Sequence, residues 1–179
     1  FIDATSNNSM LNIMKTLRYV KNLNITLVGV NSIEILKVFS EFQISSLTLL
    51  YSRLKFLRNE SLTAFSMLQS LTLHDKNTYS IPKGTFHEMK SLIHLTLLYK
   101  PNVIFEKSSF YGLSNLTHLS ILYFPETYYV RKYNKTSKCF ETGVFLELHN
   151  LKVLKLTENL INCLNPGTFY GLYTIEEIH

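Results

Sequence analysis

Residues 154–172 decide the fold, and they read LKLTENLINCLNPGTFYGL. The first three alternate apolar, polar and apolar side chains, which is typical of a short strand with one buried face. Apolar residues then return at Ile161, Leu164 and Phe169, with a Pro-Gly turn between the last two. Residues 71–92 follow the same order in the sequence LTLHDKNTYSIPKGTFHEMKSL. Two segments with one pattern indicate that the chain is built from repeats.

The repeat has a period of 24 residues, measured from the apolar residue that opens each strand. These anchor residues are Leu23, Leu47, Leu71, Leu95 and Leu119, and the same phase resumes at Leu154 and Ile178. The step from Leu119 to Leu154 is 35 residues, which is one repeat with 11 inserted residues. Three further apolar positions keep a constant offset from the anchors. They are Ile25, Leu49, Leu73, Leu97, Ile121 and Leu156 two residues after; Val20, Ile44, Leu68, Leu92, Leu116, Leu151 and Ile175 three residues before; and Val38, Leu62, Phe86, Phe110 and Phe169 fifteen residues after, with Phe145 in that role beyond the insertion.

A single coil of this length cannot bury its own apolar face, so successive coils must stack on a shared core. The strands of stacked coils form a parallel sheet with a spacing of about 4.8 Å. The sequence therefore predicts one solenoid over residues 1–179, of about seven coils, with an insertion near residues 122–143. We expect its core to contain Leu71, Leu73, Leu95, Leu97, Leu119, Phe86 and Phe110.

Both quoted segments resemble the leucine-rich-repeat consensus L-x-L…L-P-x-G-x-F-x-x-L. The resemblance extends over the whole chain through the repeat period. It implies an α/β-type repeat solenoid, a leucine-rich-repeat horseshoe with a parallel β-sheet on its concave face. The irregular coils, the long insertion and the frequent glycosylation motifs resemble the ectodomains of the Toll-like receptor family in particular. That resemblance implies an innate immune receptor in which dimerised horseshoes sense a pathogen-derived ligand.

Leucine-rich repeats usually carry an asparagine five residues after the anchor, and its amide bonds to backbone groups of neighbouring coils. Only Asn159 fits this pattern. The equivalent residues in the other coils are Val28, Ser52, Lys76, Lys100 and Phe124. Because a lysine side chain cannot accept a hydrogen bond, we expect the backbone groups in these coils to find other partners.

At both ends of the chain the repeat pattern stops within a predicted strand. Phe1 falls on the second core position of a strand, and Ile178 falls on the first core position of another. Neither end carries the cysteine-rich cap that is typical of the family, and no apolar run reaches the roughly 18 residues that span a bilayer. We therefore expect a fragment of a longer ectodomain, whose remaining coils and membrane anchor lie outside these residues.

Five N-x-S/T motifs without proline indicate glycosylation, and hence an extracellular or endosomal-lumen location. The resemblance to Toll-like receptors implies that the chain is part of a single-pass membrane receptor. The acceptor residues are Asn7, Asn24, Asn59, Asn115 and Asn134. A chain rich in asparagine and serine also produces such motifs by chance, which is the alternative explanation. Hydrophobic residues make up 46% of the chain and charged residues 17%, a balance that excludes a disordered chain.

The two cysteines occupy equivalent places on consecutive coils, because Cys139 lies six residues before Phe145 and Cys163 lies six before Phe169. Stacked equivalents have Cα atoms about 5 Å apart, inside the range of roughly 4.4–6.8 Å that a disulfide needs. We therefore expect a disulfide between Cys139 and Cys163 that ties the end of the insertion to the next coil. Two unpaired thiols are the alternative.

The insertion interleaves aromatic and basic residues, among them Tyr129, Arg131, Lys132 and Tyr133. Such residues stack on bases and pair with phosphates, and loops that interrupt a regular scaffold often carry function. A solvated loop, shielded by a glycan at Asn134, is the equally weighted alternative.

The repeat register also predicts which residues face outward on the sheet. Between the core pairs lie Asn24, Thr48, Thr72, Thr96, Ser120 and Lys155, and one residue before the anchors lie Asn22, Ser46, Ser70, His94, His118 and Val153. Beyond the strands lie Leu50, His74, Leu98 and Leu122, next to Tyr51, Tyr99 and Tyr123. This predicted face is polar, with aromatic residues along one edge.

Among these residues, His94 and His118 should stack about 5 Å apart with His74 nearby. Exposed histidines need no functional explanation. They would also form an anion site in an acidic compartment, since histidine titrates near pH 6.5, and the net charge of +5 agrees with this alternative. Apart from Asp75 the neighbouring sequence lacks the Cys and carboxylate ligands of a metal site, so we expect no metal.

The predicted outward face offers no nucleophile–base–acid set, no paired carboxylates and no glycine-rich phosphate loop, so we expect neither catalysis nor a cofactor. Two functional classes remain. The first is an innate immune receptor ectodomain, including the endosomal type that senses nucleic acid, with a nucleic-acid or protein ligand from a pathogen and a dimerisation partner. The second is an extracellular adhesion or signalling protein that binds a protein partner. The candidate ligand-binding residues are His74, His94, His118, Tyr99, Tyr123, Tyr129, Arg131, Lys132 and Tyr133.

Overall fold

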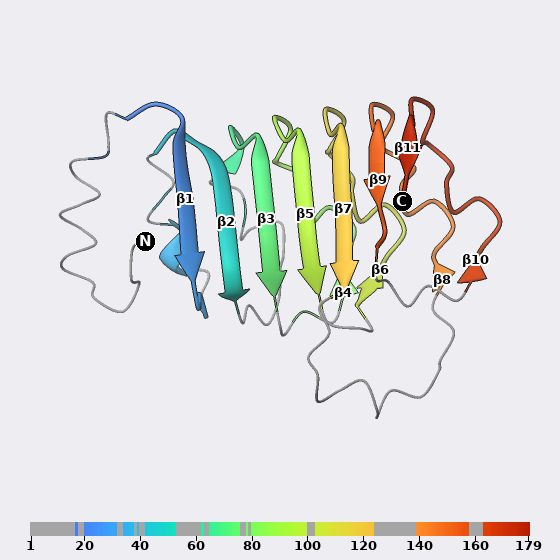
Figure 1. Cartoon of the computed structure of the whole chain (residues 1–179), viewed down its shortest axis with the longest axis horizontal. Coiled ribbons are helices and arrows are strands. Elements are labelled where there is room, and N and C mark those ends of the chain that lie inside the picture. The colour runs from blue at the N-terminus through green and yellow to red at the C-terminus, as the bar shows by residue number, and fades with distance from the viewer. Residues whose placement is uncertain are drawn as a thin grey trace.

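One parallel sheet runs the length of the molecule (Figure 1). The structure is a computed structural model that describes residues 17, 20–31, 34–37, 39, 42–52, 62, 65–75, 78, 80–99, 103–123, 139–157 and 163–179. Within these residues the sheet has seven strands in the order β1 (Leu23–Val28), β2 (Ile44–Ser52), β3 (Ser70–Asp75), β5 (His94–Tyr99), β7 (His118–Tyr123), β9 (Val153–Lys155) and β11 (Glu177–Ile178). Neighbouring strands in space are successive coils in the chain, as a repeat solenoid requires.

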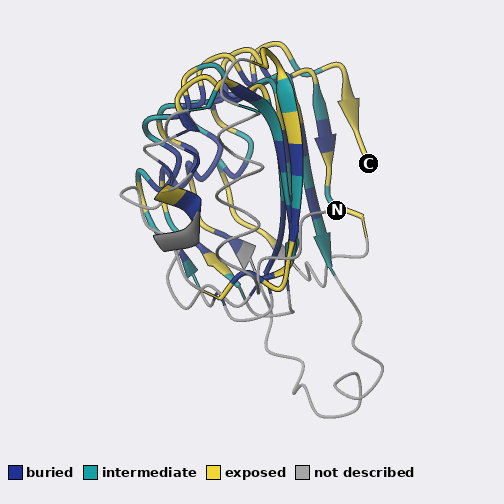
Figure 2. Cartoon of the chain, turned by 90° about the vertical axis from the view of Figure 1, so that its left-hand side faces the viewer, coloured by how far each residue is buried: buried dark blue, intermediate teal, exposed yellow. Residues whose placement is uncertain are grey.

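The return half of each coil lies on the other side of the core and consists of turns and short elements (Figure 2). Two parallel strand pairs lie there, β4 (Ser80–Ile81) with β6 (Ile104–Phe105) and β8 (Cys139–Phe140) with β10 (Cys163–Leu164). The helix α2 (Glu34–Lys37) lies in the first coil. No helix among the described residues is both long enough and apolar enough to cross a bilayer.

The predicted core is confirmed. Leu71 pairs with Leu95, Leu95 with Leu119, and Leu119 with Leu154, so the 24-residue period continues across the insertion. All seven residues expected in the core are buried: Leu71, Leu73, Leu95, Leu97, Leu119, Phe86 and Phe110. Their burial on one continuous cluster is the stacking that the repeat pattern predicts.

A column of phenylalanine rings fills the far side of this core. The ring centroids of Phe86 and Phe110 lie 6.1 Å apart, those of Phe110 and Phe145 5.8 Å apart, and those of Phe145 and Phe169 6.3 Å apart. The planes are nearly parallel, at 4°, 13° and 5°. One aromatic ring from each of these four coils therefore stacks on the ring of the next coil on the far side of the core.

The register predicted for the first coil is wrong by two residues. Ile25 pairs with Leu47 and Leu27 with Leu49, so Leu23 is not the anchor. Ile25 and Leu27 are buried, whereas Val20, expected to be a core residue, is 42% exposed. The cause is the alternation from Leu23 to Leu27, which offers three apolar residues for two core positions. A slip of two residues keeps the same face inward, so sequence alone cannot choose between the two registers.

The two-residue slip changes which residue of β1 lies beside each outward residue of β2. Asn24 is the counterpart of Ser46, Thr26 of Thr48, and Val28 of Leu50. Asn22 precedes the strand instead of facing outward within it, and its φ of 58° places it in the left-handed region. On the far side of this coil the buried aromatic is Phe39. Val38, predicted for that role, lies outside the described residues.

The asparagine positions of the repeat are replaced as expected in at least one coil. Ser52 is buried, and its hydroxyl donates to the backbone carbonyl of His74 on the next coil at 3.0 Å. With the corrected register the first coil places Val30 there, also buried, instead of Val28. Lys76, Lys100, Phe124 and Asn159 lie outside the described residues.

The sheet face as a candidate binding surface

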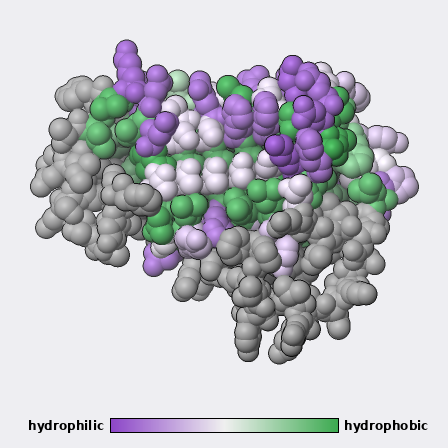
Figure 3. Space-filling view, viewed as in Figure 1, coloured by the Kyte–Doolittle hydropathy of each residue, from purple (hydrophilic) through white to green (hydrophobic). Residues whose placement is uncertain are grey.

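The outward side chains of the sheet form three parallel rows. The histidine row contains Asn24, Ser46, Ser70, His94, His118, Val153 and Glu177. The hydroxyl row contains Thr26, Thr48, Thr72, Thr96 and Ser120, and it ends at Lys155. The apolar row contains Val28, Leu50, Leu98 and Leu122. Figure 3 shows the pale band of weakly polar residues crossing the sheet between green bands, with purple residues along the upper edge.

The strands β1, β2, β3, β5 and β7 contain no lysine, arginine or glutamate. Their one aspartate, Asp75, is 3% exposed and accepts a hydrogen bond from the Thr78 hydroxyl at 2.8 Å. Within the described strands of the sheet, exposed lysine, arginine, aspartate and glutamate side chains appear only at the C-terminal end, at Lys155 and Glu177. Most of the face is therefore uncharged at neutral pH, although the chain carries a net charge of +5.

The predicted histidine stack is confirmed. His94 and His118 are register partners on β5 and β7, and their ring centroids lie 4.7 Å apart with 29° between the planes. Both side chains are exposed. Partial burial lowers the pKa of His94, and the neighbouring His118 lowers it further because two imidazolium charges repel. His94 is therefore uncharged at neutral pH.

The Thr117 hydroxyl links the His118 ring to the preceding coil. It lies 2.8 Å from Nδ1 of His118 and 3.3 Å from the carbonyl oxygen of Ile93.

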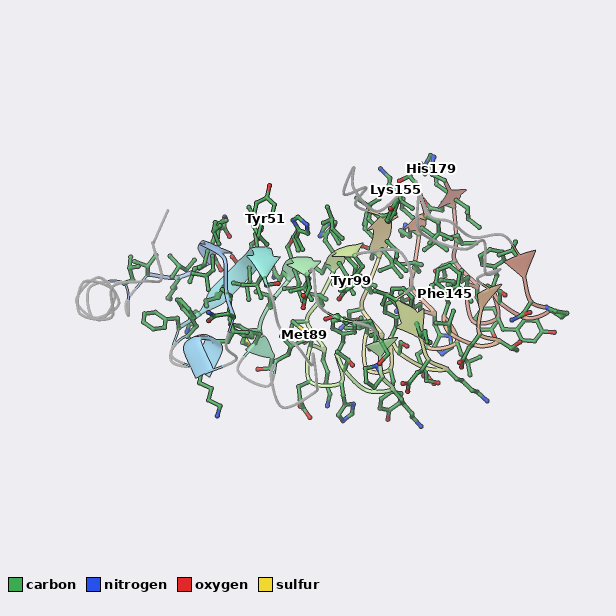
Figure 4. All side chains as sticks on the ribbon, turned by 90° about the horizontal axis from the view of Figure 1, so that it is seen from below. Tyr51, Met89, Tyr99, Phe145, Lys155 and His179 are labelled. Carbon is green, nitrogen blue, oxygen red and sulfur yellow. The ribbon has the colours of Figure 1, made fainter. Side chains whose placement is uncertain are left out.

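The expected exposure of His74 and Tyr99 is wrong, since both are buried at 4% and 3%. Tyr51 covers His74, with ring centroids 4.7 Å apart. Tyr99 is the sixth residue of β5, and strand alternation turns it inward against Phe105, at 6.3 Å between centroids. Figure 4 shows Tyr99 inside the solenoid, while Tyr51 points away from it on the sheet side.

The inward position of Tyr99 has an electrostatic consequence. Burial raises the pKa of Tyr99 well above its usual value, and the negative charge of Asp75 raises it further. The phenol is therefore neutral, and its oxygen has no hydrogen-bond partner among the described residues. Neither Tyr99 nor His74 can present its ring to a ligand from this position. Tyr123, in the same place on β7, is half-buried.

Tyr51, which the repeat register places at the aromatic edge of this face but which is absent from the predicted ligand-binding residues, lies at an irregularity that the sequence does not reveal. Leu49 pairs with Leu73 and Ser52 with Asp75, so two residues of β2, Leu50 and Tyr51, oppose His74 alone. This is a β-bulge. Tyr51 has a φ of 53° and is 47% exposed. Successive anchors remain 24 residues apart despite the extra residue in the strand, so the repeat period does not reveal the bulge.

The remaining predicted sites are only partly described. Cys139 and Cys163 are register partners on β8 and β10, which confirms that they are equivalent, and the disulfide between them stays a prediction. Asn24 and Asn115 are exposed. Asn7, Asn59, Asn134, Tyr129, Arg131, Lys132 and Tyr133 lie outside the described residues. No three His, Cys, Asp or Glu side chains gather as a metal site in the described part of the chain.

Comparison with known proteins supports the same class of fold. The family described as "Leucine rich repeat" matches residues 138–179. The chain is similar to a chain of the Toll–Spatzle complex, described for Drosophila, with a TM-score of 0.61 and 20% identity over 82% of this chain and 18% of that chain. It is also similar to a chain of the TLR13–ssRNA13 complex, with a TM-score of 0.59 and 21% identity over 94% of this chain and 26% of that chain. No curated protein matches the sequence.

The chain is thus a leucine-rich-repeat solenoid. Within that class its fold is similar to chains of the Toll–Spatzle and TLR13–ssRNA13 complexes, in agreement with the resemblance drawn from the repeats. It spans 18% and 26% of the lengths of these two structures.

Proposed function

We infer that the chain is a ligand-binding segment of an innate immune receptor ectodomain of the Toll-like type, exposed to the cell exterior or an endosomal lumen. The sheet face is its ligand surface, and the ligand is a protein. The segment acts together with the remainder of its own ectodomain, a receptor dimerisation partner and a membrane anchor elsewhere in the receptor. The observation that carries this proposal is the uncharged sheet face between β1 and β7.

The absence of charge on these strands is what favours a protein ligand. Nucleic-acid affinity comes largely from lysine and arginine contacts with phosphates, and β1 to β7 of the sheet supply none. Hydroxyl, aliphatic and aromatic side chains instead match the core of a protein interface, which is depleted in charge and enriched in aromatic residues. Enzymatic activity is not part of this proposal.

A charge placed in the middle of the face tests the proposal. Thr72→Arg puts a cation on the half-buried hydroxyl row of β3. Ser66→Arg is the matched control, because Ser66 is exposed in a turn outside the sheet and Lys90 occupies the same place one coil later. Reporter cells would carry the complete ectodomain joined to a signalling domain and receive microbial lysate treated with protease or with nuclease.

We expect protease, but not nuclease, to remove the response, and Thr72→Arg to remove it while Ser66→Arg does not. A response that survives protease and disappears with nuclease would refute a protein ligand. A normal response from Thr72→Arg would exclude the sheet face as the contact surface.

The histidine stack favours a second candidate, a polyanion such as single-stranded RNA bound in an acidic endosome. Protonated His94 and His118 would place two charges side by side on the sheet. The charged groups near them are Glu177, Lys155 and His179. A hydrogen bond from His179 at 3.0 Å lowers the pKa of Glu177, with smaller effects from the charges of Lys155 and His118. Glu177 would offset part of the new positive charge.

A further inference from the structure

The bulge of β2 holds Tyr51 in a strained backbone conformation. A φ of 53° is rare for a bulky side chain, which lacks the freedom of glycine there. Bulges are common where a strand must re-aim a side chain. Here the bulge aims the Tyr51 ring to the sheet side (Figure 4).

Two contacts hold the bulge in place. Ser52, directly after Tyr51, is buried and donates to the His74 carbonyl at 3.0 Å. The Tyr51 ring packs on the His74 ring at 4.7 Å with 53° between the planes. The ring of Tyr51 thus packs on the buried side chain of His74, and nearly half of Tyr51 remains exposed to solvent. A rigid, partly exposed aromatic ring on a supporting layer is typical of an interface anchor.

Tyr51 lies beside the apolar row of Val28, Leu50, Leu98 and Leu122. His74 pairs with Leu98 and Leu98 with Leu122, so the ring that covers His74 continues this row between β2 and β5. Leu50, Leu98 and Leu122 are half-buried, and the hydroxyl row runs alongside them. The row therefore forms an uncharged strip that crosses the strands along the solenoid axis (Figure 3).

The spacing of this strip indicates the shape of its occupant. Successive coils place one side chain about every 4.8 Å along the axis. Apolar residues on one face of an α-helix recur at alternating intervals of three and four residues, which is about 5.3 Å on average. Residues on one face of an extended strand recur about every 6.7 Å. The side chains of a helix therefore remain nearly aligned with the side chains of the row over three coils, whereas those of a strand are misaligned after one coil.

We propose that Tyr51 and the apolar row receive an amphipathic α-helix of the protein ligand, lying across β2 to β7 along the solenoid axis. The proposal rests on the proposed function and adds the class of ligand segment. The helix places its aliphatic stripe on Leu98 and Leu122 and packs against the Tyr51 ring. Its flanking residues over the hydroxyl row are small or polar and uncharged, because Thr72, Thr96 and Ser120 are half-buried and offer hydroxyl groups only.

Two synthetic peptides of about 18 residues test this, a length above the roughly 12–15 residues that a helix needs in water. Both have the same leucine, alanine, glutamine and serine content. One carries its leucines at helical spacing and the other at every second residue. Binding to the complete ectodomain is measured by fluorescence anisotropy. We expect the helical peptide to bind at least ten-fold more tightly.

Tyr51→Asn should weaken that binding at least ten-fold. Asparagine tolerates a positive φ, so this change removes the ring without breaking the bulge, and unfolding curves check that the fold is kept. Leu98→Gln is a second variant in the same row, with the same expected loss. Tyr111→Asn is the matched control, because Tyr111 also stacks on a histidine, His87 at 5.0 Å, but in the turns beyond β6.

Equal binding of the two peptides would overturn the helical ligand. If Tyr51→Asn and Leu98→Gln weakened both peptides alike, the sheet face would stand as a protein-binding surface without a preference for a helix. Helical binding that survives both variants, or that falls equally in Tyr111→Asn, would remove the row from recognition.

Discussion

Leu95 occupies the centre of the core, where its backbone pairs with Leu71 on one side and Leu119 on the other. Its side chain is 1% exposed, so neighbouring coils surround it on every side. Leu95→Ala should lower the free energy of unfolding by about 2–5 kcal/mol, through lost burial and the cavity left between coils. Urea unfolding followed by circular dichroism measures this. A loss below about 1 kcal/mol would mean that the site relaxes far more than a close-packed core allows.

The histidine stack allows a prediction about pH at the same scale. Because the pKa of His94 is lowered, the free protein takes up a proton there only below its usual titration range. A bound polyanion favours the charged form, so binding takes up protons and its affinity must rise as pH falls. Single-stranded RNA should therefore bind the complete ectodomain more tightly at pH 5.5 than at pH 7.5, and more weakly as salt is added.

A double substitution separates these histidines from other titrating groups. His94→Ala/His118→Ala should flatten the pH dependence of RNA binding while leaving its salt dependence from the basic insertion. The same pH dependence in parent and double variant would exclude the pair from the mechanism. Absence of RNA binding at both pH values would leave the protein ligand as the remaining candidate.

At the scale of elements, β8 and β10 bring the two cysteines together. Cys139 and Cys163 are Cα partners in a parallel pair, where strands lie about 4.8 Å apart and a disulfide is geometrically permitted. We predict that this bond forms and ties the end of the insertion to the following coil. Mass spectrometry of a non-reduced digest should show the two peptides joined. Recovery of both as free thiols from correctly secreted protein would contradict the prediction.

In β1 and β2, contacts with the neighbouring strand produce a register and a bulge that the repeat pattern does not predict. The apolar residues of β1 satisfy two registers, and pairing with Ile44 and Leu47 selects one of them. In β2 the hydrogen bond from Ser52 to His74 accompanies an extra residue that exposes Tyr51. Both features depend on contacts with the adjacent coil. Neither has a signal within its own strand.

For the whole molecule, glycosylation is the most direct test of compartment. Asn24 and Asn115 are exposed, and a band shift after glycosidase treatment of protein secreted from mammalian cells should reveal glycans at several of the five motifs. Asn24 is the informative position, because it lies in the histidine row of the sheet. A glycan there would cover the β1 end and confine a ligand to later strands. Removing it with Asn24→Gln should then extend the accessible face, and an unshifted band in the parent protein would contradict a luminal location.

The sequence by itself determined the solenoid, its core, the phase across the insertion and the stacking of His94 on His118. These follow from a period repeated over the chain, and a strand with two apolar residues can bury only that face. Only the tertiary structure decided the register of β1, the burial of His74 and Tyr99, and the bulge at Tyr51. A two-residue slip or a one-residue bulge leaves local apolar alternation intact, so packing between coils, which no single coil encodes, selects the arrangement.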